Sequence, residues 1–298
     1  MDMLRISGLH KRFGDKTVLN GLELTVPEHS IFGFIGKNGS GKTTTMKTVL
    51  GLLKADVGEI LVNGERVVYG GTSTNRHIGY LPDVPEFYPF MTAPEYLHFC
   101  GSITGLRRQE TEARSRELLE LVGLAGEKHR IKGFSRGMKQ RLGIAQALLN
   151  RPKLLICDEP TSALDPTGRK EILDILLTAR EQTTVLFSTH ILSDVERICT
   201  DVAFLDNGVI GIQGTLSEIK AKYRREEYLL EPERKTDISL LRQAFSMEPA
   251  GEDQLIFREK DSTLFDLLRF AADRRIPLVR LERAAPTLES LFMEVTGK

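Results

Sequence analysis

One octapeptide constrains the fold of this chain more than any other part of its 298 residues. Residues 36–43 read GKNGSGKT; a short apolar run at 31–35 precedes them, and a helical pattern that continues to Leu53 follows. Glycines let the backbone turn so that successive N–H groups point inward, and the helix that follows adds its positive end. In this setting the pattern predicts a phosphate-binding loop. The alternative, a chance glycine-rich turn, leaves the flanking strand and helix unexplained.

The residue types within the loop predict how it holds a nucleotide. Backbone N–H groups surround phosphate oxygens, the Lys42 ammonium meets the terminal phosphates, and the Thr43 hydroxyl is a ligand of Mg²⁺. Lys42 therefore also counts as a predicted catalytic residue. The predicted nucleotide-binding residues of the loop are Gly36, Lys37, Asn38, Gly39, Ser40, Gly41, Lys42, Thr43 and Thr44.

Two carboxylates follow a second apolar run. Asp158 and Glu159 come directly after residues 154–157, which read as a buried strand. Such a strand delivers Asp158 to the magnesium beside Thr43, directly or through water. Glu159 is then placed to polarise the attacking water, which makes it a predicted catalytic residue. A strand that happens to end in acidic turn residues is the alternative, and the phosphate loop disfavours it.

The spacing of apolar residues predicts an α/β fold. Near the N-terminus apolar and polar residues alternate as in half-buried strands, and Asn63-Gly64 between apolar flanks predicts a hairpin within residues 59–68. Beyond Pro152, strands alternate with helices, which implies a mainly parallel sheet with crossover connections. The expected strands are 154–157, 184–187 and 202–205, and the expected helices are 167–181 and 191–199.

A mostly helical stretch interrupts this alternation. Residues 92–150 include helix formers at 110–122, and Ser135 is a predicted N-cap of a helix that runs to Leu149. This stretch lies between expected strands of the sheet. We therefore expect it to form an inserted helical subdomain, at about residues 84–150.

A second, smaller domain is predicted at the C-terminal end. The charged run at 224–227 marks the expected boundary, with domains at 1–223 and 224–298. Strands are expected at 227–231, 255–258 and 278–282 and helices at 238–245, 263–274 and 287–295, which together describe a small α+β module. Four phenylalanines there could line the pocket of a regulatory ligand, although a hydrophobic core is the simpler interpretation. They are Phe257, Phe265, Phe270 and Phe292.

Composition excludes several classes of protein. The 41 basic and 41 acidic residues balance, which argues against a general nucleic-acid binder, so no nucleic-acid partner is expected. No apolar run approaches the ~20 residues that span a bilayer, and the N-terminus does not resemble a signal peptide. The three cysteines lie far apart and fit a reducing cytosol. We expect any membrane to be reached through a partner.

Residues 134–141, FSRGMKQR, separate the possible classes of phosphate-loop protein. Here the sequence resembles the ATP-binding subunit of ABC transporters, from about Leu4 to Tyr223. We call residues 134–141 the signature loop. In that family the signature loop of one subunit closes on the ATP held by the other, so the resemblance implies that Ser135 and the Gly137 backbone meet the γ-phosphate across a dimer interface. For Ser135 alone, an ordinary helix N-cap is the alternative.

Three further elements match the same family. Residues 162–165, SALD, resemble the loop through which two subunits communicate. His190 resembles the switch histidine that contacts the γ-phosphate and is a predicted catalytic residue, although a histidine there could also be a helix cap. Phe13 resembles the aromatic residue that stacks on adenine, and a core or surface phenylalanine is its alternative.

The sequence departs from the family pattern at two places. Asp83 stands where the family usually carries glutamine; it can approach magnesium through a water molecule and is a predicted metal contact together with Thr43 and Asp158. Arg136 and Met138 stand where the commonest signature has glycine and glutamine. Arg136 either adds positive charge near the bound phosphate or faces solvent.

The resemblance implies a function as well as a fold. One branch of the family resembles this chain in three segments, which are the signature loop, residues 80–82 and residues 286–292. Its members are bacterial motors that pair with separately encoded permeases, so the resemblance favours export over import. We therefore expect a P-loop NTPase core with an N-terminal antiparallel β subdomain. Its expected role is that of an ATP-hydrolysing motor that uses ATP and Mg²⁺ at the cytoplasmic face of a bacterial membrane.

The expected partners are a second copy of the chain or a homologous ATP-binding subunit, and a transmembrane permease. The alternative function is a soluble ABC-type ATPase in translation or DNA maintenance. The single phosphate loop and the lack of a long insertion between the motifs disfavour it. No residue of a motor subunit encodes the transported substrate.

Overall fold

The computed structural model describes residues 2–223, 227–251, 253–258 and 261–283, together with residues 288, 289 and 291. The chain divides into two compact units, the first comprising Met1–Leu216 and Val295–Lys298 and the second comprising Ser217–Glu294. This division lies seven residues before the expected boundary at 223/224, and most of the charged run at 224–227 lies outside the described residues.

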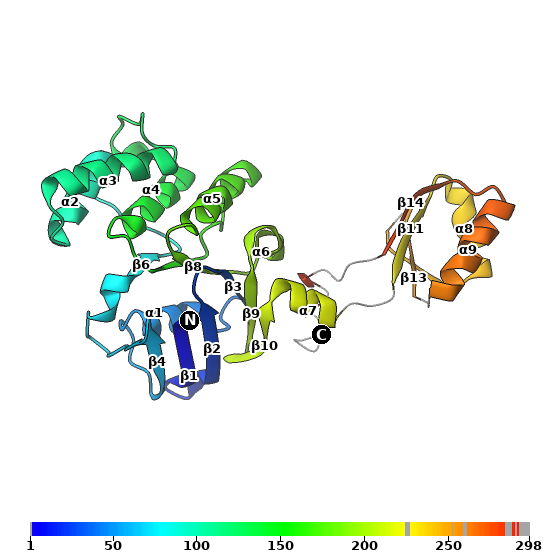
Figure 1. The fold of residues 1–298 in the computed structure, drawn as a ribbon, viewed down its shortest axis with the longest axis horizontal. Helices are drawn as coiled ribbons and strands as arrows, with labels where there is room; N and C mark the ends of the chain where they lie inside the picture. The colour runs from blue at the N-terminus through cyan, green and yellow to red at the C-terminus, as the bar shows by residue number, and fades with distance from the viewer. Residues whose placement is uncertain are drawn as a thin grey trace. The chain divides into compact units, whose positions relative to one another are not determined.

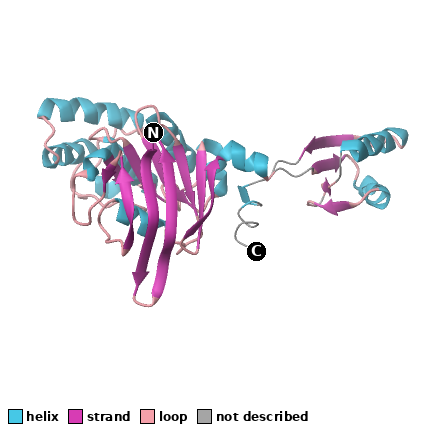
Figure 2. Cartoon of the chain, turned by 60° about the horizontal axis from the view of Figure 1, so that its bottom comes forward, coloured by secondary structure: helices cyan, strands magenta, loops and turns pink. Residues whose placement is uncertain are grey.

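The first unit contains a six-stranded sheet in the order β10-β9-β3-β8-β7-β6 (Figures 1 and 2). The five strands from β9 to β6 pair in parallel, and β10 joins the edge antiparallel to β9. The α/β prediction with a mainly parallel sheet is thereby confirmed. The strands are β3 (Ile31–Ile35), β6 (Ile78–Leu81), β7 (Leu154–Asp158), β8 (Thr184–Thr189), β9 (Asp201–Asp206) and β10 (Val209–Thr215).

A second, antiparallel sheet forms the N-terminal β subdomain. Its order is β2-β1-β4-β5, with β1 (Asp2–Phe13), β2 (Lys16–Pro27), β4 (Val57–Val62) and β5 (Glu65–Arg66). The strands β4 and β5 form the hairpin that Asn63-Gly64 predicts, and both turn residues have positive φ, as a tight hairpin requires. Both sheets and the helix α1 (Lys42–Val49) contribute to one apolar core, which includes Leu4, Phe32 and Met46.

The inserted helical part follows β6. It contains α2 (Ala93–Ile103), α3 (Arg108–Leu121) and α4 (Arg136–Leu148), which pack against one another and of which α4 also packs on β6. Ser135 is the N-cap of α4: its hydroxyl accepts a hydrogen bond of 3.2 Å from the Met138 N–H. Two more helices follow β7 and β8, namely α5 (Pro166–Ala179) and α6 (Leu192–Ile198). No helix among the described residues is long and apolar enough to cross a membrane.

The second unit is an α+β module, as predicted. Its four-stranded antiparallel sheet has the order β12-β13-β11-β14. The elements of this part are α7 (Leu216–Lys222), β11 (Tyr228–Pro232), α8 (Lys235–Ala244), β12 (Met247–Pro249), β13 (Leu255–Phe257), α9 (Asp261–Asp273) and β14 (Leu278–Arg283). The strand β12 was not predicted, because two of its three residues are Glu248 and Pro249, which are uncommon in strands.

The phenylalanines of this unit serve mainly as core. Phe257 is fully buried, and Phe270 packs against the same apolar cluster, whereas Phe265 is exposed. These positions do not describe a shared ligand pocket. Phe292 and most of the expected helix at 287–295 lie outside the described residues.

Candidate nucleotide-binding site

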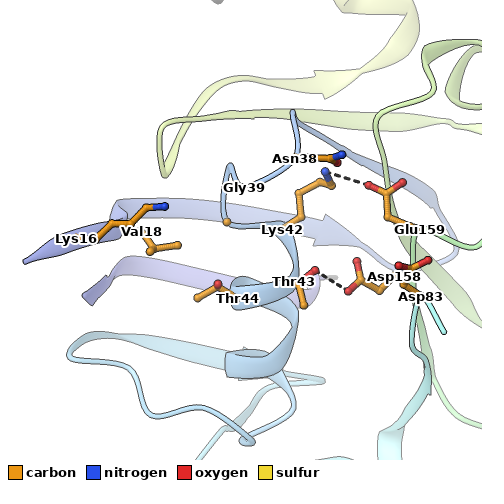
Figure 3. Close-up of a pocket in the computed structure, with 11 residues that line it drawn as sticks. Lys16, Val18, Asn38, Gly39, Lys42, Thr43, Thr44, Asp83, Asp158 and Glu159 are labelled. Atoms are coloured by element: carbon orange, nitrogen blue, oxygen red, sulfur yellow. Dashed lines mark hydrogen bonds and ion pairs between the residues drawn. The ribbon is translucent and has the colours of Figure 1, made fainter. Parts of the chain in front are cut away.

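A pocket of about 480 Å³ lies in front of the phosphate loop, where β3 gives way to α1 and β7 ends (Figure 3). It lies at the carboxyl ends of parallel strands, the usual ligand site of an open α/β sheet. The residues that line it are Lys16, Val18, Asn38, Gly39, Gly41, Lys42, Thr43, Thr44, Asp83, Asp158 and Glu159.

The phosphate loop has the shape that its glycines predict. Gly39 and Gly41 have φ of +82° and +114°, conformations that residues with a Cβ rarely adopt. The Lys42 side chain is 6 % exposed and donates a hydrogen bond of 2.7 Å to the Gly36 carbonyl, so its ammonium crosses the loop. The buried Ser40 hydroxyl has no hydrogen-bond partner within the described ranges. The Lys42 ammonium lines the pocket together with Gly39 and Gly41 of the loop.

The first carboxylate, Asp158, is held from two sides at the end of β7. The Thr43 hydroxyl donates to one of its oxygens at 2.7 Å, and the Ser188 hydroxyl donates to the other at 2.6 Å. Ser188 is adjacent because β7 and β8 pair in register there. Ser188 was not predicted as a site residue, although its place in the next parallel strand was a usable signal.

The second carboxylate, Glu159, faces both a cation and an imidazole. One oxygen lies 3.1 Å from Lys42 Nζ and the other 2.8 Å from His190 Nδ1. The Glu159 backbone has φ of +49°, which is strained for a residue with a side chain, and its N–H donates to Ser188 Oγ at 3.0 Å. The strained backbone aims the carboxylate into the pocket rather than along the strand.

These groups suit a polyphosphate with a hard divalent cation. Thr43 and Asp158 offer oxygen ligands side by side, which is the ligand type that Mg²⁺ prefers, and Mg²⁺ is usually bound by one or two protein oxygens plus substrate phosphates. Glu159 could accept a proton from, or orient, a water molecule at the end of the phosphate chain. His190, half exposed, is close enough to influence the same carboxylate.

Asp83 lies in the pocket wall. Its Oδ1 accepts a hydrogen bond of 2.8 Å from the Ser162 hydroxyl and lies 3.4 Å from an Arg136 guanidinium nitrogen. Arg136 therefore forms an ion pair instead of only facing solvent, and its partner Asp83 is the other residue that departs from the family pattern. Sequence reasoning did not connect these two positions, because they are 53 residues apart.

Seven predicted site residues do not line the pocket of their own chain. Gly36, Lys37 and Ser40 belong to the phosphate loop, and His190 contacts the pocket residue Glu159; the other three are Phe13, Ser135 and Gly137. Ser135 and Gly137 lie at the start of α4, and Phe13, which is 49 % exposed, lies at the end of β1. Phe13 pairs with Lys16, which does line the pocket. Lys16 and Val18 were not predicted; only their position just after Phe13 could have indicated them.

The fold and the site define a P-loop nucleotide-binding ATPase domain. Two protein-family models match the chain: the ABC transporter model at residues 19–162 and the C-terminal domain of DrrA1-3-like ATP-binding proteins at residues 214–296. The solved structure of an ATP-binding subunit of an ABC transporter is 33 % identical, with a TM-score of 0.66, over 74 % of this chain and 93 % of that one.

Several curated relatives match across nearly the whole chain, and two of them illustrate the family. The uncharacterized ABC transporter ATP-binding protein YxlF of Bacillus subtilis (strain 168) is 38 % identical over 98 % of this chain and 99 % of its own length. The bacitracin transport ATP-binding protein BcrA of Bacillus licheniformis is 36 % identical over 99 % of this chain and 97 % of its own. The chain belongs to the family of ABC transporter ATP-binding proteins, which are ATPases that power transport.

Proposed function

We propose that this chain is the motor subunit of a bacterial exporter and drives a separately encoded permease. The observation that carries the proposal is the match to BcrA, because it extends through both units rather than through the ATPase core alone. The DrrA1-3-like model over residues 214–296 supports the same branch. We assign the ATPase domain to residues 1–223 and an accessory domain to residues 224–298.

The site geometry supports a role for each pocket residue. The Lys42 ammonium pairs with the terminal phosphates, and Thr43 and Asp158 hold Mg²⁺, with Asp83 reaching it through water. When bound, Mg²⁺ neutralises charge on the terminal phosphates. Glu159 orients the attacking water and accepts its proton, while His190 positions the Glu159 carboxylate and senses the γ-phosphate.

The signature loop acts on a partner's nucleotide in this proposal. Ser135 and Gly137 lie outside the pocket of their own chain, yet they begin a helix, where N–H groups attract anions. Two chains placed head to tail would bring each signature loop to the other's phosphate loop, with ATP between them. Phe13 would stack on adenine at the outer end of the same site.

The proposed assembly is peripheral to the cytoplasmic face of the membrane. It combines two ATP-binding subunits, identical or homologous, with the permease. Binding of ATP closes the pair and hydrolysis reopens it, and the helical subdomain passes that motion to the permease.

Co-purification tests this proposal most simply. The chain is tagged in its own host, membranes are solubilised in detergent, and the bound proteins are identified. A multi-span permease should co-purify, and cells should retain more of its substrate when Lys42 is replaced by Ala. Recovery of ribosomes or DNA without any permease would contradict the proposal and support the soluble ABC-type ATPase instead.

A further inference from the structure

Asp83 gives the nucleotide pocket a third carboxylate. It lies in the same pocket wall as Asp158 and Glu159, and the cationic side chains that line this pocket are Lys16 and Lys42 (Figure 3). A carboxylate beside a polyphosphate raises the free energy of the bound state by charge repulsion. A glutamine at this position would bring no such charge. The protein therefore needs a counter-charge for Asp83, or binds ATP more weakly.

Two side chains on one face of α4 contact Asp83. The buried Gln140 side chain donates a hydrogen bond of 2.9 Å to the Asp83 carbonyl, and the Arg136 guanidinium lies 3.4 Å from the Asp83 carboxylate. Arg136 and Gln140 are four residues apart on α4, so both side chains point the same way. The buried contact fixes the Asp83 backbone against α4, which keeps its carboxylate within reach of Arg136.

Ser162 completes the arrangement from a third segment. Its hydroxyl donates to Asp83 Oδ1 at 2.8 Å and accepts a hydrogen bond of 3.1 Å from Arg136. The three side chains thus form a closed triangle that joins the loop after β6, the start of α4 and the loop after β7. The Oδ1 atom of Asp83 makes both of its contacts within this triangle.

The electrostatic field at the pocket wall reflects the carboxylates around it. Burial, and next the charge of Asp158, raise the pKa of Tyr80 to about 12, and the charge of Asp83 adds to the same effect. The charge of Asp83 is therefore felt at a neighbouring residue of β6.

We propose that Arg136 is a positioning residue: it neutralises Asp83 and turns its carboxylate toward α4, which lowers the repulsion between Asp83 and bound Mg·ATP. The two departures from the family pattern are then one functional pair. Arg136 acts through Asp83 and touches neither nucleotide nor metal of its own chain. The inference rests on the proposal that Mg·ATP occupies this pocket.

The test is a double-mutant cycle on the affinity for Mg·ATP. The full chain carries Glu159→Gln so that hydrolysis does not interfere, and the Kd is measured by calorimetry at low and at high salt. Arg136→Ala should raise the Kd about 2- to 5-fold, the range of an exposed ion pair. Adding Asp83→Gln, which removes the charge but keeps an oxygen for the Mg²⁺ contact, should return the Kd to near that of the parent, and the effect of Arg136→Ala should shrink at high salt.

Arg197→Ala is the matched control. Arg197 forms a surface ion pair with Asp174 at 2.9 Å, and the exposure of the two side chains, 40 % and 50 %, is close to that of Arg136 and Asp83, at 45 % and 49 %. This variant should leave the Kd for Mg·ATP unchanged. That result would show that the loss of an exposed arginine charge does not by itself weaken binding.

Two results would overturn the inference. An unchanged Kd for Arg136→Ala would show that Asp83 needs no counter-charge. A raised Kd that Asp83→Gln fails to rescue would show that Arg136 acts on the nucleotide directly. Absence of Mg·ATP binding in the parent would instead contradict the assignment of the pocket, so the two failures are distinguishable.

Discussion

The Lys42 ammonium lies 3.1 Å from a carboxylate oxygen of Glu159, and the two side chains are only 6 % and 12 % exposed. This ion pair joins the phosphate loop to the end of β7. A γ-phosphate that binds Lys42 would compete with Glu159 for the ammonium and free that carboxylate to face a water molecule. The pair therefore couples ATP binding to the orientation of the proposed base.

Replacing Glu159 by Gln separates the two roles of this residue, which are the ion pair with Lys42 and the activation of water. The variant should bind Mg·ATP at least as tightly as wild type, because no carboxylate then competes for Lys42. Its turnover should fall by about 10²- to 10⁴-fold, the usual contribution of a general base. Steady-state ATPase rates and a binding isotherm check both parts. Turnover at the wild-type rate would mean that Glu159 does not activate the water.

Substitutions at Phe13 test whether its ring stacks on the adenine of ATP. Its ring is half exposed, and Lys11 Nζ lies 5.3 Å from its centroid. Phe13→Ala should raise the Kd for ATP about 10-fold, as expected for the loss of one stacked base, while Phe13→Tyr should not. Inorganic triphosphate has no base, so its Kd should be the same for all three proteins. Equal losses for ATP and triphosphate would refute stacking.

Gly36 is tightly packed within the phosphate loop. A Cβ there would lie 2.5 Å from Ser40 Oγ and 2.7 Å from the Leu205 carbonyl oxygen, so Gly36→Ala must displace the loop. We expect destabilisation by about 1–3 kcal/mol and weaker ATP binding. Gly126→Ala is the control, because a Cβ there meets nothing within 4 Å. Denaturant unfolding measures the difference, and equal stability of the two variants would argue against the close contact.

The N-terminus of α2 should be sensitive to acid. The Thr92 backbone N–H, and next its hydroxyl, lower the pKa of Glu95 from its ordinary 4.5. Because the folded state favours the ionised form, this contribution is present above pH 4.5 and is lost as the pH falls through the lowered pKa. Glu95→Gln should therefore lower the Tm at neutral pH, and the gap should narrow near pH 4. A gap that is constant with pH would contradict this account.

Much of the fold could be predicted because the central strands β3, β7 and β8 contain runs of apolar residues, and because glycines mark several turns. The strand β3 matches its predicted range residue for residue, and Ser135 caps α4 as its residue type indicates. The helix α1 ends at Val49, short of the predicted Leu53, because Gly51 has φ of +68° and turns the chain.

The site was only partly predictable, because some of its contacts depend on strand register and loop position. Ser188 reaches Asp158 through the pairing of β7 with β8, and Arg136 reaches Asp83 across 53 residues. Neither position belongs to a spacing pattern within one segment. The strand β12 gives no strand signal because Glu248 and Pro249 interrupt any apolar pattern.

The central claim, that each site is shared between two chains, is tested most directly by mixing two inactive variants. Lys42→Ala removes the ammonium of the phosphate loop, and Gly137→Asp places a carboxylate on the signature loop. A Cβ at 137 meets nothing nearer than 3.9 Å in its own chain, and an acidic residue in the first turn suits a helix. Each variant alone should hydrolyse little ATP.

A mixed dimer pairs the intact phosphate loop of one chain with the intact signature loop of the other. An equal mixture should therefore regain about a quarter of wild-type ATPase activity, since half of the dimers are mixed and one of their two sites is intact. Full activity of Gly137→Asp by itself, or no recovery on mixing, would contradict a site shared between chains.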